Sequence, residues 1–319
     1  MAEDTMQEAF SASILLNLSV RMPGNAKKVS DESALADGEQ HADHSWLALS
    51  KRLIDAEEFD AIKTVTGRMK RFLERKCIVA KGKKGSRPAI SKFIKPGIYI
   101  LPLGLVAEVD AELEVFKREF AEARDKFIEA YPYLQEAARE KLKDLYNQED
   151  YPDADTLKDA FAIEYSYMNV TTPKALEAIS AEIFRREQAQ AEKQWSEATE
   201  EIRMVLRTGF QQLVDWMVEV LSQTEDGERR KSFRESSAGR MMDFLEDFSA
   251  KNITKDSELA ALIEKAKDLL DGQDPRTMKR DIKKEDWRDA MLDKFSELKT
   301  ELEPLVQNAR VRQIILAED

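Results

Sequence analysis

The chain has one cysteine, Cys77, and two histidines, His41 and His44, among 319 residues. A single cysteine excludes an internal disulfide framework and a cysteine metal cage, and it is typical of a reducing compartment. Both histidines lie in a glycine- and acid-rich loop with no partner at helical spacing, whereas a zinc site needs ligands fixed on a helix face and usually a third ligand. We therefore interpret this pair as part of a solvated loop, and histidine-based acid–base catalysis has little to work with.

Long apolar runs and chain-breaking residues are also scarce. The longest apolar run near the N-terminus, Ile14-Leu15-Leu16, is far too short to span a bilayer, and Glu3 and Asp4 stand where an export signal is basic. We expect no export signal, no membrane span and a cytoplasmic protein. Eleven glycines and nine prolines predict long uninterrupted elements, and 35% charged residues suit helices with one apolar stripe.

The first part of the chain, residues 1–103, is predicted to be a small α/β head. Residues 12–20 alternate apolar and polar side chains, which indicates a half-buried strand, and Ile98–Leu101 is its candidate partner. A short helix is expected from Trp46 to Ile54 and a second one from Ala56 to Cys77.

The second part, residues 104–225, is predicted to hold two long helices. Apolar side chains spaced alternately three and four residues apart predict a helix up to Ala130. We expect Tyr131-Pro132-Tyr133 to interrupt it, a restart until Tyr146, and a further helix after the turn at Asp150–Asp155 that runs through Met168. Thr172-Pro173 is a good helix start, and nothing stops that helix before Ser222.

Two long striped helices suggest an antiparallel hairpin in which each stripe covers the other. A coiled-coil dimer is the alternative, but the wide stripe around Trp216 favours the bundle. The stretch from Phe184 to Gln194 is more polar and is expected to project with little packing around it. The candidate helix-packing side chains are Leu113, Phe116, Phe120, Phe127, Trp195, Ile202, Leu213 and Trp216.

The third part, residues 226–319, is predicted to be a C-terminal helical bundle. Helices are expected over Ser232–Phe248, Asp256–Leu270 and Lys284–Glu303, the last stopped by Pro304. The predicted fold is therefore mainly α, with an elongated hairpin or coiled-coil arm between a small α/β head and this bundle.

Positive charge is concentrated in one segment of an acidic chain. The net charge is −12, yet the stretch from Ala61 to Gly97 holds twelve lysines and arginines against one acid, Glu74. Solvated charge that balances the acidic helices, nucleic-acid phosphates and an acidic protein surface are three interpretations. A pI near 5 argues against a general nucleic-acid binder but allows a local site.

Within this segment the contacts to phosphates or to an acidic partner would come from a lysine-rich loop. Phe72, Phe93 and Tyr99 are its candidate stacking groups. The candidate cationic contacts are Lys81, Lys83, Lys84, Arg87, Lys92 and Lys95.

Three other motifs are better explained by structure than by chemistry. Gly82–Ser86 lacks the spacing of a nucleotide-binding P-loop. Asp150, Asp153 and Asp155 do not fit a calcium loop, because its glycine and glutamate positions are not met, and they suit an N-cap and turn. Cys77, beside Ile78 and Val79, fits a buried structural cysteine.

Several short motifs in this order resemble a known family. They are Ser50–Asp55, Gly97–Pro102, the helix end Phe127–Tyr131, Lys251–Leu259, and Leu269–Gly272 followed by Asp274-Pro275. Together they resemble domain-of-unknown-function family 3150 of phages, plasmids and other mobile elements. The lysine-rich insertion at Lys81–Lys95 is longer than the resemblance would lead one to expect.

Members of that family are typically encoded beside a MoxR- or CobS-like AAA+ ATPase and a protein with a von Willebrand factor A (VWA) domain. The resemblance therefore implies a non-enzymatic adaptor or structural partner of such an ATPase, in a bacterial or phage setting, with no catalytic residues or cofactor to carry over. Self-association through the hairpin is a further expectation. The alternative is a nucleic-acid-binding protein that uses the basic segment 63–95.

Overall fold

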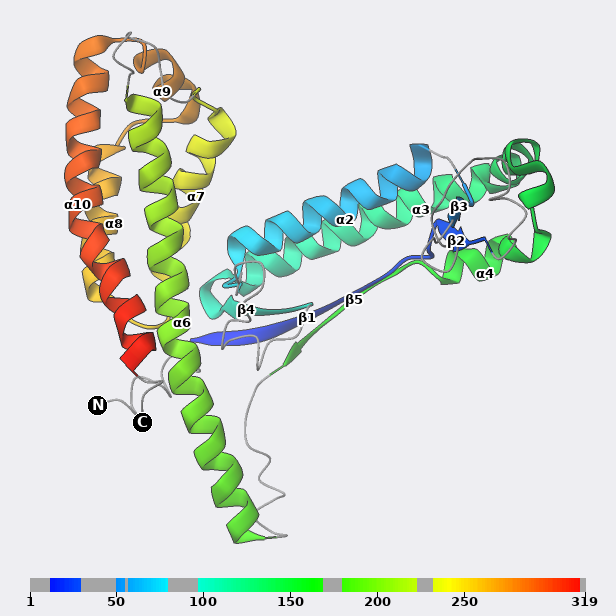
Figure 1. The fold of residues 1–319 in the computed structure, drawn as a ribbon, viewed down its shortest axis with the longest axis horizontal. Helices are drawn as coiled ribbons and strands as arrows, with labels where there is room; N and C mark the ends of the chain where they lie inside the picture. Colours follow the sequence, from blue (N-terminus) through cyan, green and yellow to red (C-terminus); the bar gives the residue numbers. More distant parts are fainter. Residues whose placement is uncertain are drawn as a thin grey trace, which may run out of the picture. The chain divides into compact units, whose positions relative to one another are not determined.

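The computed structural model describes residues 12–29, 50–54, 57–79, 97–168, 180–222 and 232–315. Helices dominate these residues and a small sheet accompanies them, which confirms the mainly α fold (Figure 1). Contacts group the chain into two units, and the predicted consecutive parts 1–103, 104–225 and 226–319 stay a prediction. The first unit comprises Met1–Asn17, Leu73–Ala107 and Tyr167–Asp319, and the second comprises Leu18–Phe72 and Glu108–Ser166.

The sheet has the strand order β4-β1-β5, with β1 at Ser13–Arg21, β4 at Ile98–Pro102 and β5 at Ala162–Met168. Strands β1 and β4 are antiparallel, with Leu15 opposite Ile100, so the predicted pairing is confirmed. The helix predicted to run through Met168 is wrong, because its second half is strand β5. Alternating apolar and polar side chains with two tyrosines suit a strand better than a helix there.

A second antiparallel pair joins β2, Ala26–Lys28, to β3, Ser50–Arg52. The helix expected over Trp46–Ile54 is therefore wrong at Ser50–Arg52, and Trp46–Leu49 lie outside the described residues. Next to these two strands, the side chain of Asn25 forms hydrogen bonds with the backbone of Ile54, as a paired strand would. Its Oδ1 accepts from the Ile54 amide at 2.7 Å, while its Nδ2 donates to the Ile54 carbonyl at 2.5 Å.

Helices α2, Glu57–Lys76, and α3, Val106–Leu142, pack side by side in the second unit through aromatic side chains (Figure 1). Phe59 lies 5.5 Å from Phe127, and Phe72 lies 5.9 Å from Phe116, between ring centroids. The apolar stripe of α3 is thus covered by α2, whereas the sequence paired it with the helix around Trp216.

Helix α3 runs through Pro132 without a break, so the interruption expected at Tyr131–Tyr133 is wrong. Proline costs a helix one hydrogen bond and crowds the preceding turn. Tyr131 offsets that cost, because its ring is buried beside Phe127 and its hydroxyl donates to the carbonyl of Pro152 at 3.0 Å.

In the first unit, α6 to α10 form a helical bundle (Figure 1). Helix α6 packs most extensively on α10, and Phe210, Val214, Phe295 and Leu298 are buried in the shared core. The bounds are Ala181–Leu221 for α6, Glu235–Lys251 for α7, Ser257–Leu269 for α8, Pro275–Asp281 for α9 and Glu285–Ile315 for α10.

The sequence predicted α7, α8 and α10 but missed the short helix α9. The predicted stop of the last helix at Pro304 is wrong. Leu302 and Val306 are buried on either side of that proline, so packing carries α10 across it. At the start of α6, the Ser180 hydroxyl accepts from the Ile183 amide at 3.3 Å. The predicted start at Thr172-Pro173 lies outside the described residues.

Phe161 should be a sensitive position in the second unit, because its ring meets Phe59, Phe120 and Phe127 at centroid distances of 5.6–6.3 Å. We expect Phe161→Ala to lower the free energy of unfolding by about 3–5 kcal/mol through a cavity in this cluster. Tyr133→Ala, at a site 81% exposed, should change it by less than about 0.5 kcal/mol. Urea unfolding followed by circular dichroism measures both, and equal losses would contradict this account of the core.

Candidate interaction surfaces

Helix α2 has two chemically different faces. Its inner face buries Phe59, Ile62, Met69 and Leu73. Its outer face carries the described half of the basic segment, and the side chains there are exposed. The outer cations are Lys63, Arg68, Lys70, Arg71 and Arg75.

Two of these cations are engaged by neighbouring acids. Lys63 lies 3.0 Å from Asp60, and Arg68 lies 2.8 Å from Glu119 of α3. Lys70 and Arg71 form no ion pair with any carboxylate of the described residues.

Gly67 lies in the middle of this outer face. A Cβ built there would meet only Nη1 of Arg71, at 3.6 Å, which is ordinary van der Waals contact. Glycine inside a helix costs about 0.5–1 kcal/mol relative to alanine. The fold thus tolerates alanine at this position and would be more stable with it.

The C-terminal end of α2 is tied to α7 by charged side chains. Lys76 and Lys251 both approach the buried carboxylate of Asp247, at 3.0 and 3.3 Å, and Lys251 also donates to the carbonyl of Arg75. Burial lowers the pKa of Lys251, and Asp247 partly offsets that effect. A cation on the last carbonyls of a helix is a C-terminal cap, so this cluster has a structural explanation.

Cys77 follows α2 directly and is 4% exposed. Burial raises the pKa of its thiol to about 12, although the charge of Lys251 acts in the opposite direction. A thiol in this state is a poor nucleophile, which agrees with the structural interpretation.

We expect Cys77 to resist a disulfide-exchange reagent such as DTNB in the native protein at pH 8 and to react fully in denaturant. The reason is twofold, since the sulfur is both inaccessible and protonated at that pH. Absorbance of the released thiolate measures the reaction. Rapid stoichiometric labelling of folded protein would contradict both the burial and the raised pKa.

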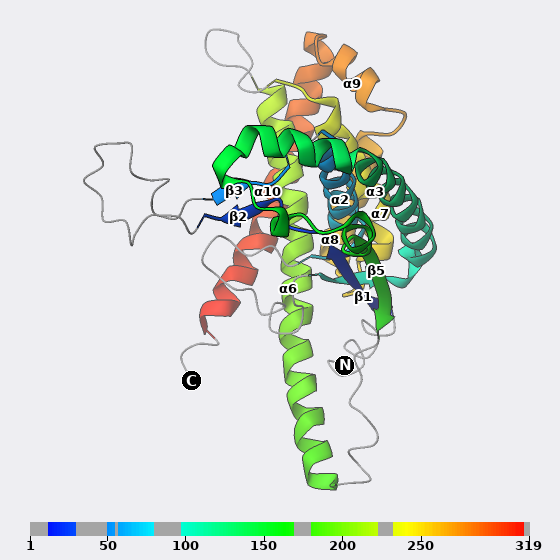
Figure 2. The ribbon, with the colours of Figure 1, turned by 90° about the vertical axis from the view of Figure 1, so that its right-hand side faces the viewer.

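Helix α6 is covered along only part of its length. Among its described side chains the first buried one is Ala198, and none of those from Ala181 to Gln190 is buried. Ile183 is 38% exposed and Phe184 is half-buried. Within this unit the first turns of α6 extend beyond the other helices, as both views show (Figures 1 and 2). The expected projection at Phe184–Gln194 agrees with this exposure.

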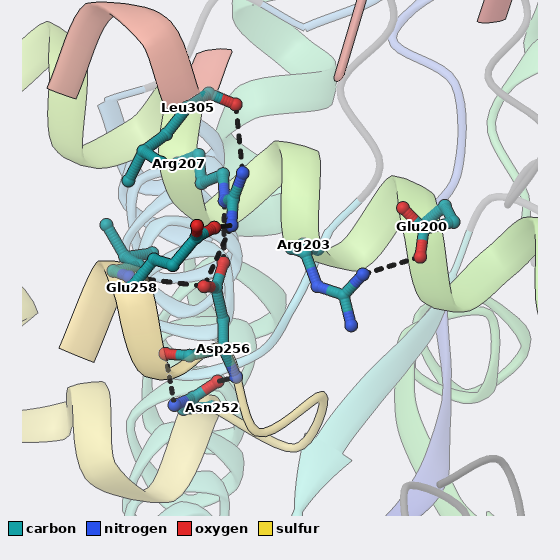
Figure 3. A network of polar contacts seen from close by, with 8 residues as sticks. Glu200, Arg203, Arg207, Asn252, Asp256, Glu258 and Leu305 are labelled. Atoms are coloured by element: carbon teal, nitrogen blue, oxygen red, sulfur yellow. Dashed lines mark hydrogen bonds and ion pairs between the residues drawn. The ribbon is translucent and has the colours of Figure 1, made fainter. Parts of the chain in front are cut away.

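A buried polar network anchors the covered part of α6 (Figure 3). The guanidinium of Arg207 donates two hydrogen bonds to Asp256, at 2.6 and 2.9 Å, and the two side chains are only 9% and 2% exposed. It also donates to Glu258 at 2.8 Å and to the carbonyl of Leu305 at 3.0 Å. One arginine thus links α6 to the start of α8 and to α10.

Asp256 has a second role as the N-cap of α8. Its carboxylate accepts from the Leu259 amide at 3.1 Å, while its own backbone exchanges two hydrogen bonds with the side chain of Asn252. Burial by itself would raise the pKa of Asp256, but the hydrogen bonds from Arg207 and Leu259 outweigh it and hold that pKa below its usual value. The carboxylate is therefore ionised and satisfied inside the bundle.

Arg207→Met should lower the free energy of unfolding by about 3–5 kcal/mol, because it leaves the Asp256 charge buried without a partner. The matched control is Lys265→Met, which breaks an exposed pair with Glu301 that also joins α8 to α10 and should cost about 0–1 kcal/mol. Urea unfolding at pH 7 measures both losses.

The Arg207 effect should also depend on pH. Since the folded-state pKa of Asp256 is lowered, its stabilisation is complete above the unfolded-state value of about 3.9 and disappears as pH falls through the folded-state value. The gap between wild type and Arg207→Met should therefore narrow at acid pH. A gap of constant size down to pH 2 would rule out Asp256 as its source.

The structure describes some of the sequence-predicted site residues and not others. Lys81, Lys83, Lys84, Arg87, Lys92, Lys95, Phe93 and both histidines lie outside the described residues, as does the side chain of Trp195. Leu113, Phe116, Phe120, Phe127 and Ile202 are buried, and Leu213 and Trp216 are half-buried against the core of the first unit. These apolar side chains belong to packing within each unit.

The remaining motifs have simple places. Asp153 is the N-cap of the short helix α4, Ala154–Asp159, and accepts from the Thr156 amide at 2.9 Å, as predicted. Asp150 lies 2.5 Å from Lys27 and 2.6 Å from Lys51. No group of three or more His, Cys, Asp or Glu side chains within the described ranges is placed to hold a metal ion. None of the helices described is both long enough and apolar enough to cross a bilayer.

Sequence reasoning missed two features of these surfaces. Arg207 and Asp256 are 49 residues apart, and nothing local marks them as a pair. Gly67 becomes noticeable only once the inner and outer faces of α2 are known.

Comparison with known proteins gives one finding. Residues 11–224 match the family described as Protein of unknown function (DUF3150). No curated protein and no solved structure matches the chain.

Proposed function

Because the chain belongs to the DUF3150 family, whose function is unknown, we propose a role from its own surfaces: a non-enzymatic helical interaction protein. It works as an adaptor or structural partner, and the uncovered start of α6 is its contact element. The observation that carries the proposal is the exposure of α6 from Ala181 onward, in a helix whose other half is firmly packed.

The packing of α6 supports a binding role for its free turns. An isolated helix of fewer than about 12–15 residues is marginal in water, so an uncovered stretch of similar length gains its order from the anchored half. Arg207 and the α10 contacts provide that anchor. A helix held rigid before binding loses less conformational entropy when a partner packs on it.

The proposed partners are a MoxR- or CobS-like AAA+ ATPase and a VWA-domain protein encoded in the same phage or mobile element, in the bacterial cytoplasm. They follow from the family resemblance and not from the geometry. Self-association of the chain through α6 is the other form of the same proposal.

The double variant Ile183→Ser, Phe184→Ser should weaken binding to the purified ATPase or VWA protein from the same genome, or dissociate a self-assembled form. Tyr133→Ser is the matched control, because it removes an apolar side chain that is 81% exposed elsewhere. Biolayer interferometry measures partner binding and light scattering measures the solution mass. If the wild-type chain binds neither protein and is monomeric, the proposal fails.

The second candidate function is nucleic-acid binding through the basic segment 63–95. The specific observation in its favour is that Lys70 and Arg71 are exposed on α2 without carboxylate partners among the described residues. The triple variant Lys83→Glu, Lys84→Glu, Arg87→Glu tests the loop part of that segment. If this variant binds DNA as tightly as the wild type, or if the affinity does not respond to salt, the loop is not a phosphate-binding site.

A further inference from the structure

The outer face of α2 places three cations around one glycine. With 3.6 residues per turn, Lys63, Lys70 and Arg71 lie within about 60° of Gly67 around the helix axis, and they span about 12 Å along it. Lys70 and Arg71 have no described carboxylate partner, while Lys63 pairs with the exposed Asp60 three residues away and lies over the ring of Phe59. Glu74 is the one acid that follows on this face.

Gly67 calls for an explanation that the fold does not provide. It has no tight neighbour, since an added Cβ would meet only the mobile end of Arg71 at 3.6 Å. The absent side chain leaves the helix backbone open to close approach, flanked on both sides by positive charge. An anionic backbone that lies against the helix would use both features together.

The chemistry of the face selects the kind of anion. Protein interfaces have an apolar or aromatic centre, and the exposed residues of this face include no large apolar side chain. Single-stranded nucleic acid needs stacking groups, and the two candidates among the described residues do not serve, because Phe72 packs on Phe116 and Tyr99 is buried in β4. A row of charge without stacking or apolar contact fits the phosphates of a duplex.

We propose that the outer face of α2 binds the phosphate backbone of duplex DNA without sequence specificity, with Gly67 at the point of closest approach and Lys63, Lys70 and Arg71 as the phosphate contacts. A stretch of α2 about 12 Å long that lies parallel to the duplex axis would extend over three to four base-pair steps, because each step rises about 3.4 Å along that axis. This inference rests on the second candidate function, and it assigns the described helix a part that does not depend on the loop at Lys81–Lys95.

The test uses the full chain, a 20-base-pair duplex and fluorescence anisotropy over a range of salt concentrations. Lys70→Gln, Arg71→Gln should weaken binding and reduce the slope of log affinity against log salt by about 2, because two phosphate contacts are lost. Gly67→Ala should weaken duplex binding severalfold while raising Tm by about 2–4 °C.

Gly239→Ala is the matched control for Gly67→Ala. Gly239 is also a half-buried helical glycine, in α7, and a Cβ there meets nothing within 4 Å. It should raise Tm by a similar amount and leave duplex affinity unchanged, so a general effect of helix stabilisation is separated from a local one.

Three outcomes would overturn the inference. They are duplex affinity in Gly67→Ala equal to that in Gly239→Ala, an unchanged salt slope in the Lys70, Arg71 variant, and tighter binding to a single strand or to polyglutamate than to the duplex. A different result is possible, in which the loop variant Lys83→Glu, Lys84→Glu, Arg87→Glu abolishes duplex binding while Gly67→Ala and Lys70→Gln, Arg71→Gln bind normally. The protein would then bind nucleic acid through the loop, and the proposed role of α2 would be wrong. If the wild-type chain does not bind the duplex at all, both the nucleic-acid-binding function and the role of α2 are wrong.

Discussion

The pairing of Arg207 with Asp256 is the constraint on which the bundle of the first unit depends. Two ions removed from water are tolerated only when their charges and hydrogen bonds are satisfied, and here one guanidinium meets two carboxylates and a carbonyl. A shift of α6 by about half a turn would move Arg207 away from Asp256, leave that carboxylate charged and unpaired, and also disturb the cap of α8. The pair therefore fixes the register of α6 more strictly than apolar contacts can, because apolar side chains accept small displacements.

That register decides which part of α6 is covered. From Ala198 onward its stripe faces α10 and α7, while the turns before it have no buried side chain among those described. In the second unit, α2 is also divided into a covered and an exposed part, but the two parts are opposite faces of the helix and not successive lengths of it. Its aromatic side chains pack on α3, which leaves the opposite face to cations and Gly67. In both helices the core contacts determine which surface remains exposed.

Periodicity predicted the elements whose residues pack on one side: β1 and β4, helices α2 and α3, and most of the C-terminal helices. It failed where a distant contact outweighed a local rule. Pro132 and Pro304 do not end their helices, because Tyr131 in one and Leu302 and Val306 in the other are held by the core. Strand β5 was missed because seven residues are too few for the pattern to exclude a helix. The packing partner of each long helix could not be predicted either, because an apolar stripe shows that another element covers the helix but does not identify that element.

The acidic net charge of the chain affects how its basic face on α2 could bind an anionic duplex. The net charge of −12 repels an anionic duplex at long range, but that repulsion is screened beyond about 8 Å at physiological ionic strength. Contacts closer than that distance respond to the local charge, which on the outer face of α2 is positive. An approach to the backbone at Gly67 would place a phosphate well inside the screening length of Lys70 and Arg71, and the acidic remainder of the chain would oppose wider wrapping. The same composition that argues against a general nucleic-acid binder is therefore compatible with a single narrow line of contact along one helix.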